Sequence, residues 1–198
     1  MNEEPRNYPL ILASGSAARR SLLVRLRIPF EVIPADIDET ASAGETPEAL
    51  VGRLAHEKAA VIAAAHPHSV VIGSDQVAVF GGAASSKPGT PSRAREYLSR
   101  FSGETITFLT GVSVQRVATG SAHAFVDRTE VVFRTLSPAE IERYIAIDDP
   151  MACAGSFKIE SLGPALFDEV RSSDPTGLPG LPLIGLSRCL REMGFALP

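Results

Sequence analysis

The feature that most constrains the fold of this chain is an apolar run that passes directly into small residues and a helical pattern. Residues 10–13 (Leu-Ile-Leu-Ala) are brief, continuous and apolar, which is typical of a buried strand. Residues 14–16 (Ser-Gly-Ser) suit a turn and a helix N-cap. Leu22, Leu23 and Leu26 then recur at helical spacing. The stretch therefore predicts a strand–turn–helix unit.

Such a turn gathers free backbone N–H groups at the start of a helix, where an anion is favoured. Arg19 and Arg20 follow within the first turns of that helix. Cations are mildly unfavourable there, by about 0.3–1 kcal/mol each, and an anionic partner would reverse the sign. Two interpretations stay open from these residues alone: an anion site, or a surface arginine pair on an ordinary strand–helix unit.

Strands and helices alternate along the rest of the chain, apart from a central hairpin. Three helices are opened by a Thr-Pro or Ser-Pro cap. The alternation predicts an α/β fold with a mixed sheet. Strands are predicted at 30–33, 70–72, 77–80, 105–117, 124–133 and 165–167, and helices at 47–65, 91–100, 138–147 and 181–193.

Composition restricts the partners that we expect. A net charge of −4 over 198 residues argues against a nucleic-acid binder, although a few local Arg and Lys can still meet a small anion. No apolar run approaches the roughly 20 residues of a membrane helix, and the polar segment 1–7 is not typical of a signal peptide. Cys153 and Cys189 suit reduced, buried structural thiols. We therefore expect a cytoplasmic protein without nucleic-acid or membrane partners.

Carboxylates follow two of the predicted strands. Asp36, Asp38 and Glu39 form either a solvated acidic turn or a site for a hard cation such as Mg²⁺. Asp75 comes after the strand at 70–72, with Gly73 and Ser74 between them, and ligands in open α/β sheets bind beyond the carboxyl ends of strands. Asp75 is thus a candidate metal ligand or general base, or simply an aspartate where a strand turns.

Two lysines complete the set of candidate residues. Lys58 lies on the predicted helix 47–65 and taken alone reads as an exposed helix lysine. Lys87 precedes Pro88 on a loop or strand edge. Neither an HExxH zinc motif nor a GxxxxGK[ST] phosphate loop is present, which argues against a zinc protease or a P-loop kinase.

In their order along the chain, these motifs resemble the Maf family of nucleoside triphosphate pyrophosphatases. The resemblance runs from about Leu10 to Leu190 and depends on the ordered set rather than on any one motif. The set comprises residues 12–16 with Arg19 and Arg20, 30–32, 36–39, 53–55 with Lys58 and Ala59, 73–76, 87–88, 98–103, 110–111 and 131–134.

The resemblance implies a single domain over residues 8–195, with a curved mixed sheet flanked by helices and two lobes around a nucleotide cleft, often in a homodimer. It implies hydrolysis between the α and β phosphates, which gives a nucleoside monophosphate and pyrophosphate, with Mg²⁺ or Mn²⁺ as cofactor. Matched position by position, the triphosphate is handled by Ser14, Arg19, Lys58 and Lys87, while Glu39 and Asp75 are the catalytic and metal-binding acidic pair.

These roles agree with the chemistry of the side chains. Arg19 could form a bidentate pair with phosphate oxygens through two N–H donors, while Lys58 and Lys87 would act as point charges. Asp75 is the residue that the resemblance assigns as proton acceptor, and beside a divalent cation it could activate the attacking water.

Later motifs look like the branch of the family that acts on 7-methyl-GTP. Gln76, Glu160 and the loop at 153–158 carry this likeness. A carboxylate at Glu160 can accept the N–H donors of a guanine edge and favours a base made cationic by methylation. The alternatives are the same reaction on dTTP, UTP, CTP or modified nucleotides, or a non-catalytic nucleotide sensor that regulates cell division. A pure binder would not need Asp75 beside the phosphates.

One position departs from that branch. Ala17 and Ala18 stand where the branch has Pro-Trp, and the chain contains no Trp. A Trp would stack on a cationic base with about 0.5–2 kcal/mol of cation–π attraction, which Ala18 cannot supply. Either Phe157 or another ring substitutes for it, or the preference for the base is looser.

Overall fold

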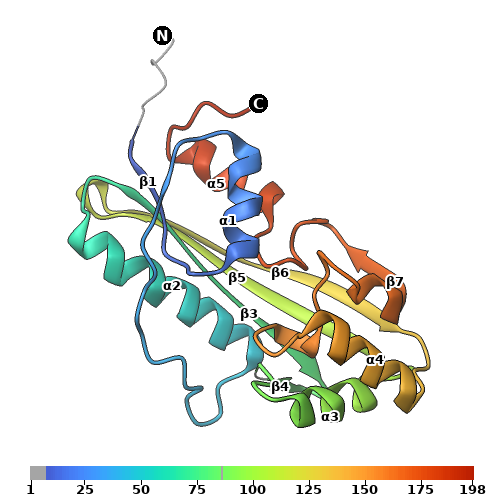
Figure 1. Cartoon of the computed structure of the whole chain (residues 1–198). Coiled ribbons are helices and arrows are strands. Elements are labelled where there is room, and N and C mark those ends of the chain that lie inside the picture. Colours follow the sequence, from blue (N-terminus) through green and yellow to red (C-terminus); the bar gives the residue numbers. More distant parts are fainter. Residues whose placement is uncertain (1–7, 86) are drawn as a thin grey trace. The chain divides into compact units, whose positions relative to one another are not determined.

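A seven-stranded mixed sheet forms the centre of the fold in the computed structural model, which describes residues 8–85 and 87–198 (Figure 1). The polar segment 1–7 lies outside the described residues. The strand order is β2-β1-β3-β5-β6-β7, with β4 paired to β3. The strands are β1 (Leu10–Leu12), β2 (Glu31–Val32), β3 (Val70–Phe80), β4 (Ala83–Ser85), β5 (Thr105–Arg116), β6 (Ser121–Phe133) and β7 (Phe167–Ser172).

Parallel and antiparallel pairs both occur in the sheet. β1 pairs in parallel with β2 and with β3, whereas β4 runs antiparallel to β3 and β7 antiparallel to β6. The expected α/β fold with a mixed sheet flanked by helices is therefore confirmed.

The three helices with a predicted Thr or Ser cap begin directly after that residue. Thr46, Thr90 and Ser137 accept a hydrogen bond from the backbone three residues on, and Ser137 with Glu140 forms a full capping box. The helices are α1 (Ala17–Leu23), α2 (Pro47–Ala65), α3 (Pro91–Phe101), α4 (Pro138–Asp148) and α5 (Leu183–Glu192).

The chain divides into two compact units. The first contains residues 8–75, 110–127 and 174–198, and the second contains residues 76–109 and 128–173. Strand β3 passes from one to the other between Asp75 and Gln76. The single domain at 8–195 and the nucleotide cleft stay predictions.

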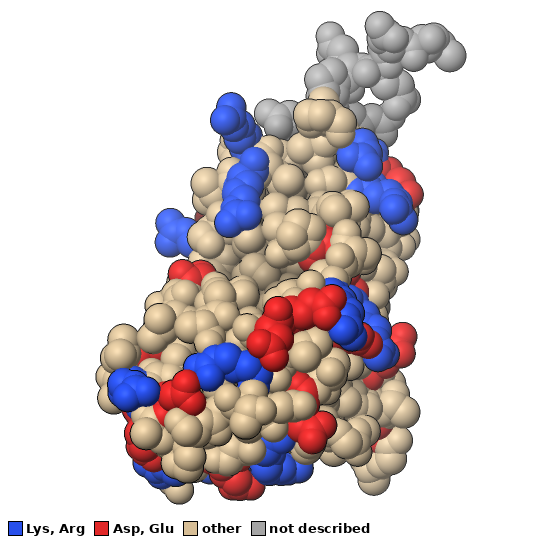
Figure 2. Space-filling view, turned by 90° about the vertical axis from the view of Figure 1, so that its right-hand side faces the viewer, with Lys and Arg blue, Asp and Glu red and all other residues tan. Residues whose placement is uncertain are grey.

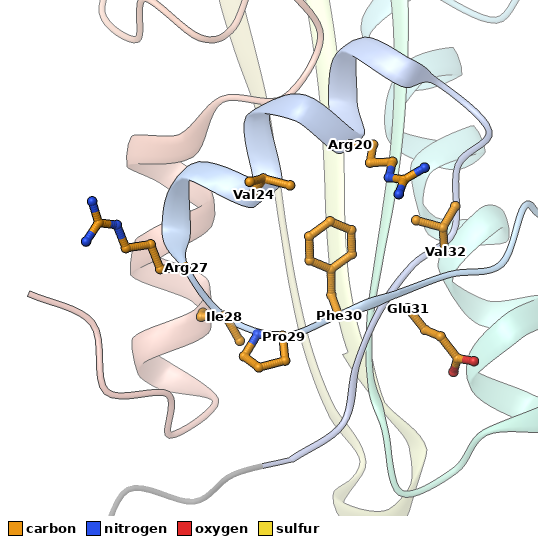
Figure 3. A pocket seen from close by; sticks show the side chains of 8 residues that line it. All are labelled: Arg20, Val24, Arg27, Ile28, Pro29, Phe30, Glu31 and Val32. Atoms are coloured by element: carbon orange, nitrogen blue, oxygen red, sulfur yellow. The ribbon is translucent and has the colours of Figure 1, made fainter.

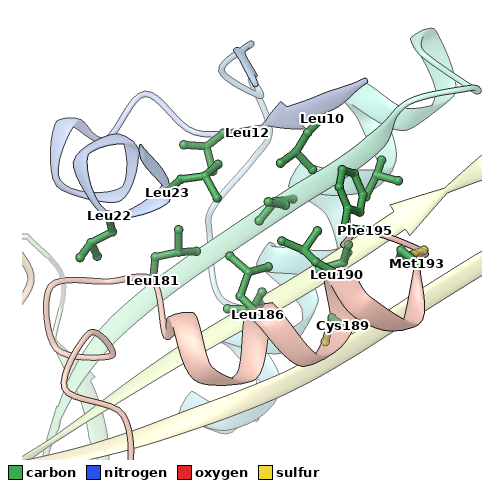
Figure 4. Packing of buried hydrophobic residues seen from close by; sticks show 14 residues of the cluster. Leu10, Leu12, Leu22, Leu23, Leu181, Leu186, Cys189, Leu190, Met193 and Phe195 are labelled. Carbon is green, nitrogen blue, oxygen red and sulfur yellow. The ribbon is translucent and has the colours of Figure 1, made fainter. Parts of the chain in front are cut away.

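The core of the first unit follows the alternation of its strands. Leu10 and Leu12 pack with buried residues of α1 and α5 on one face (Figure 4). Ile11 points the other way and packs with Ala59 and Ala63 of α2. Because successive side chains of a strand alternate between faces, a three-residue strand is covered by helices on both sides.

Aromatic rings form the core of the second unit. Phe133 contacts three other rings at centroid distances of 5.6 Å to Phe101, 5.8 Å to Phe157 and 4.9 Å to Phe167. The contacts with Phe157 and Phe167 are edge-to-face, an arrangement that aromatic pairs prefer.

Gly73 accounts for the main error in the predicted elements. The two strands predicted at 70–72 and 77–80 are one continuous strand, β3. Gly73 does not turn the chain: a Cβ there would lie 2.1 Å from the Ala55 carbonyl oxygen and 2.6 Å from the Ala59 nitrogen. The glycine is required because the backbone of α2 approaches β3 closely.

Other differences are shifts at the ends of elements. The strand predicted at 165–167 is a 3₁₀ turn over Gly163–Leu166, followed by β7. The last helix begins at Leu183 instead of 181, and the hairpin strand begins at Ser121 instead of 124.

Surface charge and helix length bear on the expected partners. The face in Figure 2 carries both basic and acidic side chains with uncharged surface between them. Within residues 8–85 and 87–198, no helix combines the length and the apolar character that crossing a membrane requires.

Candidate active site

Lys58 joins the two acidic residues that the sequence singles out. Its Nζ lies 2.6 Å from Glu39 Oε1 and 2.7 Å from Asp75 Oδ1. Lys58 is 7% exposed, so the interpretation of an exposed helix lysine is wrong. An ammonium buried to this extent requires charged partners, and the two carboxylates supply them. An ammonium has three N–H donors, and the two contacts that Lys58 makes among the described residues leave one donor for a ligand.

Asp75 lies in the middle of β3 rather than beyond a strand end. It is 8% exposed, and its Oδ1 accepts the hydrogen bond from Lys58. Its Oδ2 accepts no hydrogen bond from any residue in the described ranges. One oxygen is thus held by a cation while the other can face a water molecule.

Arg19 is held by the protein itself. Its Nε donates to the Gly180 carbonyl at 2.9 Å, and its Nη1 donates to the Ser74 carbonyl at 2.8 Å and to Ser14 Oγ at 3.2 Å. Burial lowers the pKa of Arg19, while the nearby charges of Asp75 and Glu39 raise it. Because Nε and Nη1 are engaged, only Nη2 is left for a phosphate, and the bidentate grip through two nitrogens is not available in this arrangement.

The serines before α1 accept hydrogen bonds from backbone N–H groups of the predicted anion site. Ser14 Oγ accepts from the Ser16 nitrogen at 3.3 Å, and Ser16 Oγ accepts from the Arg19 nitrogen at 3.3 Å. Helix α1 is only seven residues long. Two of the backbone donors that were expected to meet an anion therefore already have partners.

The acidic run resolves into two kinds of residue. Asp36 and Asp38 are exposed, as the solvated-turn interpretation predicts. Asp38 Oδ1 accepts from the Thr40 nitrogen at 2.9 Å, and hydrogen bonding to Thr40 lowers the pKa of Asp38. Only Glu39 reaches Lys58, so it alone of the three fits the functional interpretation.

Arg53 and Ser74 also shape the site, although sequence reasoning assigned neither a role. Arg53 on α2 forms a two-point ion pair with Glu45, with Nε–Oε1 at 2.7 Å and Nη2–Oε2 at 2.8 Å. Ser74 is completely buried, and its Oγ donates to the Gly180 carbonyl at 3.1 Å, the same oxygen that Arg19 contacts. The Ser74–Gly180 contact joins residues 106 positions apart, and the Arg53–Glu45 pair links a helix to the loop before it, so no periodic pattern marks either contact.

A metal ion would have two protein ligands in this unit. Across residues 8–85 and 87–198, no three or more His, Cys, Asp or Glu side chains gather in a way that could hold a metal. Glu39 and Asp75 do converge on one point, since both contact the same ammonium. Mg²⁺ is commonly bound by one or two carboxylates together with substrate phosphates and water, so this donor set fits it.

A pocket of about 520 Å³ lies elsewhere on the first unit and is lined by residues of α1, of β2 and of the segment between them (Figure 3). Arg20 and Arg27 provide its basic groups, and Phe30 contributes an aromatic ring. None of the predicted site residues lines it, so Arg20 and Arg19 face different surroundings.

Gln76, Lys87 and Glu160 belong to the second unit, and their predicted roles stay predictions. Lys87 and Glu160 are exposed. The loop that carries Glu160 is anchored to α4: the Lys158 nitrogen donates to Tyr144 Oη at 2.9 Å, and Ser161 Oγ donates to Asp148 Oδ1 at 2.5 Å.

Two further expectations are corrected by burial. Phe157 is 4% exposed and packs edge-to-face against Phe167 at 4.7 Å, so its ring cannot replace the missing Trp as a stacking surface. Both cysteines are free thiols, as expected. Cys189 is buried, as predicted, whereas Cys153 is only half-buried. Burial raises the pKa of each thiol, which makes both poor nucleophiles.

Comparison with known proteins extends over almost the entire chain. A family model described as "Maf-like protein" matches residues 9–193. The 7-methyl-GTP pyrophosphatase of Xanthomonas campestris pv. campestris (strain 8004) is 52% identical over 189 residues, which cover 96% of this chain and 98% of the relative. The 7-methyl-GTP pyrophosphatase of Albidiferax ferrireducens is 49% identical over 192 residues, which cover 97% of this chain and 96% of the relative. Among solved structures, the match with the Ham1 protein of Staphylococcus aureus covers 63% of this chain and 71% of the Ham1 chain, with 15% sequence identity and a TM-score of 0.47.

Proposed function

Because this chain belongs to the Maf-like protein family, we propose that it is a nucleoside triphosphate pyrophosphatase acting on 7-methyl-GTP. The observation that carries the proposal is the buried ammonium of Lys58 between Glu39 and Asp75. A cation that is charge-paired yet has a donor left over suits the stabilisation of phosphate oxygens while a carboxylate handles the proton.

The proposed reaction is hydrolysis at the α phosphorus. A water oxygen bonds to the α phosphorus, the bond from that phosphorus to the α–β bridging oxygen breaks, and pyrophosphate leaves. Asp75 accepts the proton that the water loses, through the oxygen that Lys58 does not hold. Lys58 steadies Asp75 and offers its remaining N–H to the phosphates.

Charge balance supports a divalent cation in this site. The positive charges of Arg19 and Lys58 are matched by the negative charges of Glu39 and Asp75. A triphosphate brings several more negative charges, which this set alone does not neutralise. We propose that Glu39 and Asp75 hold Mg²⁺ or Mn²⁺, which when bound would neutralise phosphate charge and lower the pKa of a bound water.

The substrate assignment depends on the relatives and on Glu160. Relatives about half identical to this chain are named 7-methyl-GTP pyrophosphatase. An exposed carboxylate at Glu160 can accept N–H donors of the guanine edge. Ala18 and the buried ring of Phe157 favour a second candidate, the same reaction with a looser choice of base.

A panel of canonical and modified triphosphates tests the proposal, with Mg²⁺ or Mn²⁺ supplied and pyrophosphate and monophosphate scored separately. We expect 7-methyl-GTP to have the highest kcat/KM, with one pyrophosphate released per monophosphate. Release of single phosphates, or binding without turnover of any nucleotide, would overturn it. Equal rates on several bases would favour the second candidate.

Glu160→Gln separates the choice of base from the chemistry. We expect it to lower the preference for 7-methyl-GTP over GTP while the α–β bond is still cleaved. Glu104→Gln, which removes another exposed carboxylate of the second unit, serves as the control. An unchanged ranking of substrates in Glu160→Gln would contradict the role of Glu160.

We further propose that the protein works in the cytoplasm, since its two thiols are free. A homodimer and the absence of nucleic-acid partners are also proposals. Light scattering at several protein concentrations tests the first, and a salt-dependent DNA and RNA binding assay tests the second.

A further inference from the structure

We propose that Arg53 is a positioning residue that holds Glu39 against Lys58, an inference that rests on the proposed function. Arg53 contacts neither Lys58 nor Asp75. It acts on the loop at residues 34–46, which carries Glu39 and has no helix or strand of its own.

The guanidinium of Arg53 fastens this loop at two points. Its Nη2 donates to the Thr40 carbonyl at 3.1 Å, one residue after Glu39. The same nitrogen and Nε form the two-point pair with Glu45, whose Oε2 also accepts from the Ser42 nitrogen at 2.9 Å. The loop is therefore tied to α2 on the side next to Glu39.

Glu39 meets the buried Lys58 from an exposed position on this loop. Its side chain is 51% exposed, whereas the Lys58 side chain that it meets is 8% exposed. A carboxylate on an irregular exposed loop samples many positions unless neighbouring backbone is fixed. Because the backbone of the next residue, Thr40, is held by Arg53, the Glu39 carboxylate is kept close to Lys58.

The simpler explanation is an ordinary surface ion pair on a helix. Arg53 does pair with Glu57 at 3.2 Å one turn away, and exposed pairs of that kind contribute little. The Glu45 pair differs, since the Glu45 side chain is only 9% exposed and the guanidinium also holds a backbone carbonyl. A planar fork can make these contacts together, and a lysine cannot.

A double-mutant cycle between Arg53 and Glu39 tests the inference, with kcat and KM measured for the wild type, Arg53→Ala, Glu39→Gln and the double variant. We expect Arg53→Ala to lower kcat by roughly 10–100-fold, as is typical when a group that orients a ligand is removed, with little change in KM. Arg53→Lys should fall between Arg53→Ala and the wild type. In the Glu39→Gln background, Arg53→Ala should cost almost nothing further.

Arg95→Ala is the matched control, because Arg95 also makes a two-point pair with a glutamate, Glu142, elsewhere on the surface. It should leave kcat unchanged. If Arg53→Ala does not fold, Arg53→Lys and Glu45→Gln take its place in the cycle.

The outcomes separate the two proposals. Effects of Arg53→Ala and Glu39→Gln that multiply, or an Arg53→Ala variant as active as the wild type, would overturn the positioning role and leave the pyrophosphatase intact. A wild-type protein that releases no pyrophosphate from any nucleotide would instead overturn the proposed function.

Discussion

Lys58 Nζ lies 2.7 Å from Asp75 Oδ1, although Lys58 belongs to α2 and Asp75 to β3. The distance depends on how closely the helix packs on the strand. That approach is set at Gly73, two residues before Asp75, where the α2 backbone occupies the space that a Cβ would fill. A packing contact without chemistry of its own thereby places the ammonium on the carboxylate.

Gly73→Ala is expected to destabilise the protein, because the nearest atoms to the new methyl group are backbone and cannot rotate away. Forcing extra volume into a packed site costs about 1–3 kcal/mol. The same variant should lose activity even where it is folded, since Lys58 and Asp75 move apart. Urea unfolding and kcat measured on the same preparation check both effects.

Gly52→Ala is the control for that prediction. Gly52 lies within α2, and a Cβ there meets nothing within 4 Å. Replacing a helix-interior glycine by alanine should stabilise the protein by about 0.5–1 kcal/mol. If both substitutions shifted stability equally, the close approach at Gly73 would not be what limits the site.

Asp75→Asn is expected to lower kcat by about 10²–10⁴-fold, the usual contribution of a general base. The asparagine oxygen can still accept from Lys58, so the packing of the site and nucleotide binding should survive. Calorimetric titration with a non-hydrolysable triphosphate, beside single-turnover assays, checks the two parts. Full turnover in this variant would refute Asp75 as the proton acceptor.

Features with local causes are the ones that the sequence predicts correctly. The Thr46, Thr90 and Ser137 caps specify where three helices begin, because a cap and its partner lie three residues apart. The continuous apolar run at residues 10–13 likewise predicts a buried strand, and β1 is covered by helices on both faces.

Features that depend on distant contacts were missed or misassigned. In the sequence Gly73 follows the predicted end of a strand, and only the approach of α2 shows it to be a packing position inside β3. Lys58 reads as exposed because its partners lie 17 and 19 positions away along the chain. Arg19 is hydrogen-bonded to Ser74, 55 positions away, and to Gly180, 161 positions away, and no periodicity reveals such contacts.

Glu140 should make stability depend on pH below its unfolded pKa. Hydrogen bonds from the Ser137 side chain and backbone, together with the Arg134 ion pair, lower the pKa of Glu140 from 4.5 to about 2. As the pH falls below 4.5 the unfolded chain takes up a proton that the folded protein does not, so stability declines until the pH passes the folded pKa.

The measurement is the Tm of the wild type and of Glu140→Gln as a function of pH. We expect the wild type to be the more stable of the two above pH 4.5, and the difference to shrink as the pH approaches 2. A constant gap between wild type and Glu140→Gln would contradict the assignment.

Ala18→Trp tests whether the base of the nucleotide lies over α1. Ala18 is half-buried on this helix beside Arg19, and the buried Phe157 offers no ring in its place. If a methylated, cationic guanine stacks there, the new indole should add about 0.5–2 kcal/mol, or roughly two- to thirtyfold in affinity for 7-methyl-GTP.

Nucleotides with uncharged bases should gain less affinity. Ala17→Trp, on the exposed neighbouring position, is the control and should change the affinity for neither kind of nucleotide. Equal gains for all bases would indicate general apolar contact, and no gain from Ala18→Trp would place the base away from α1.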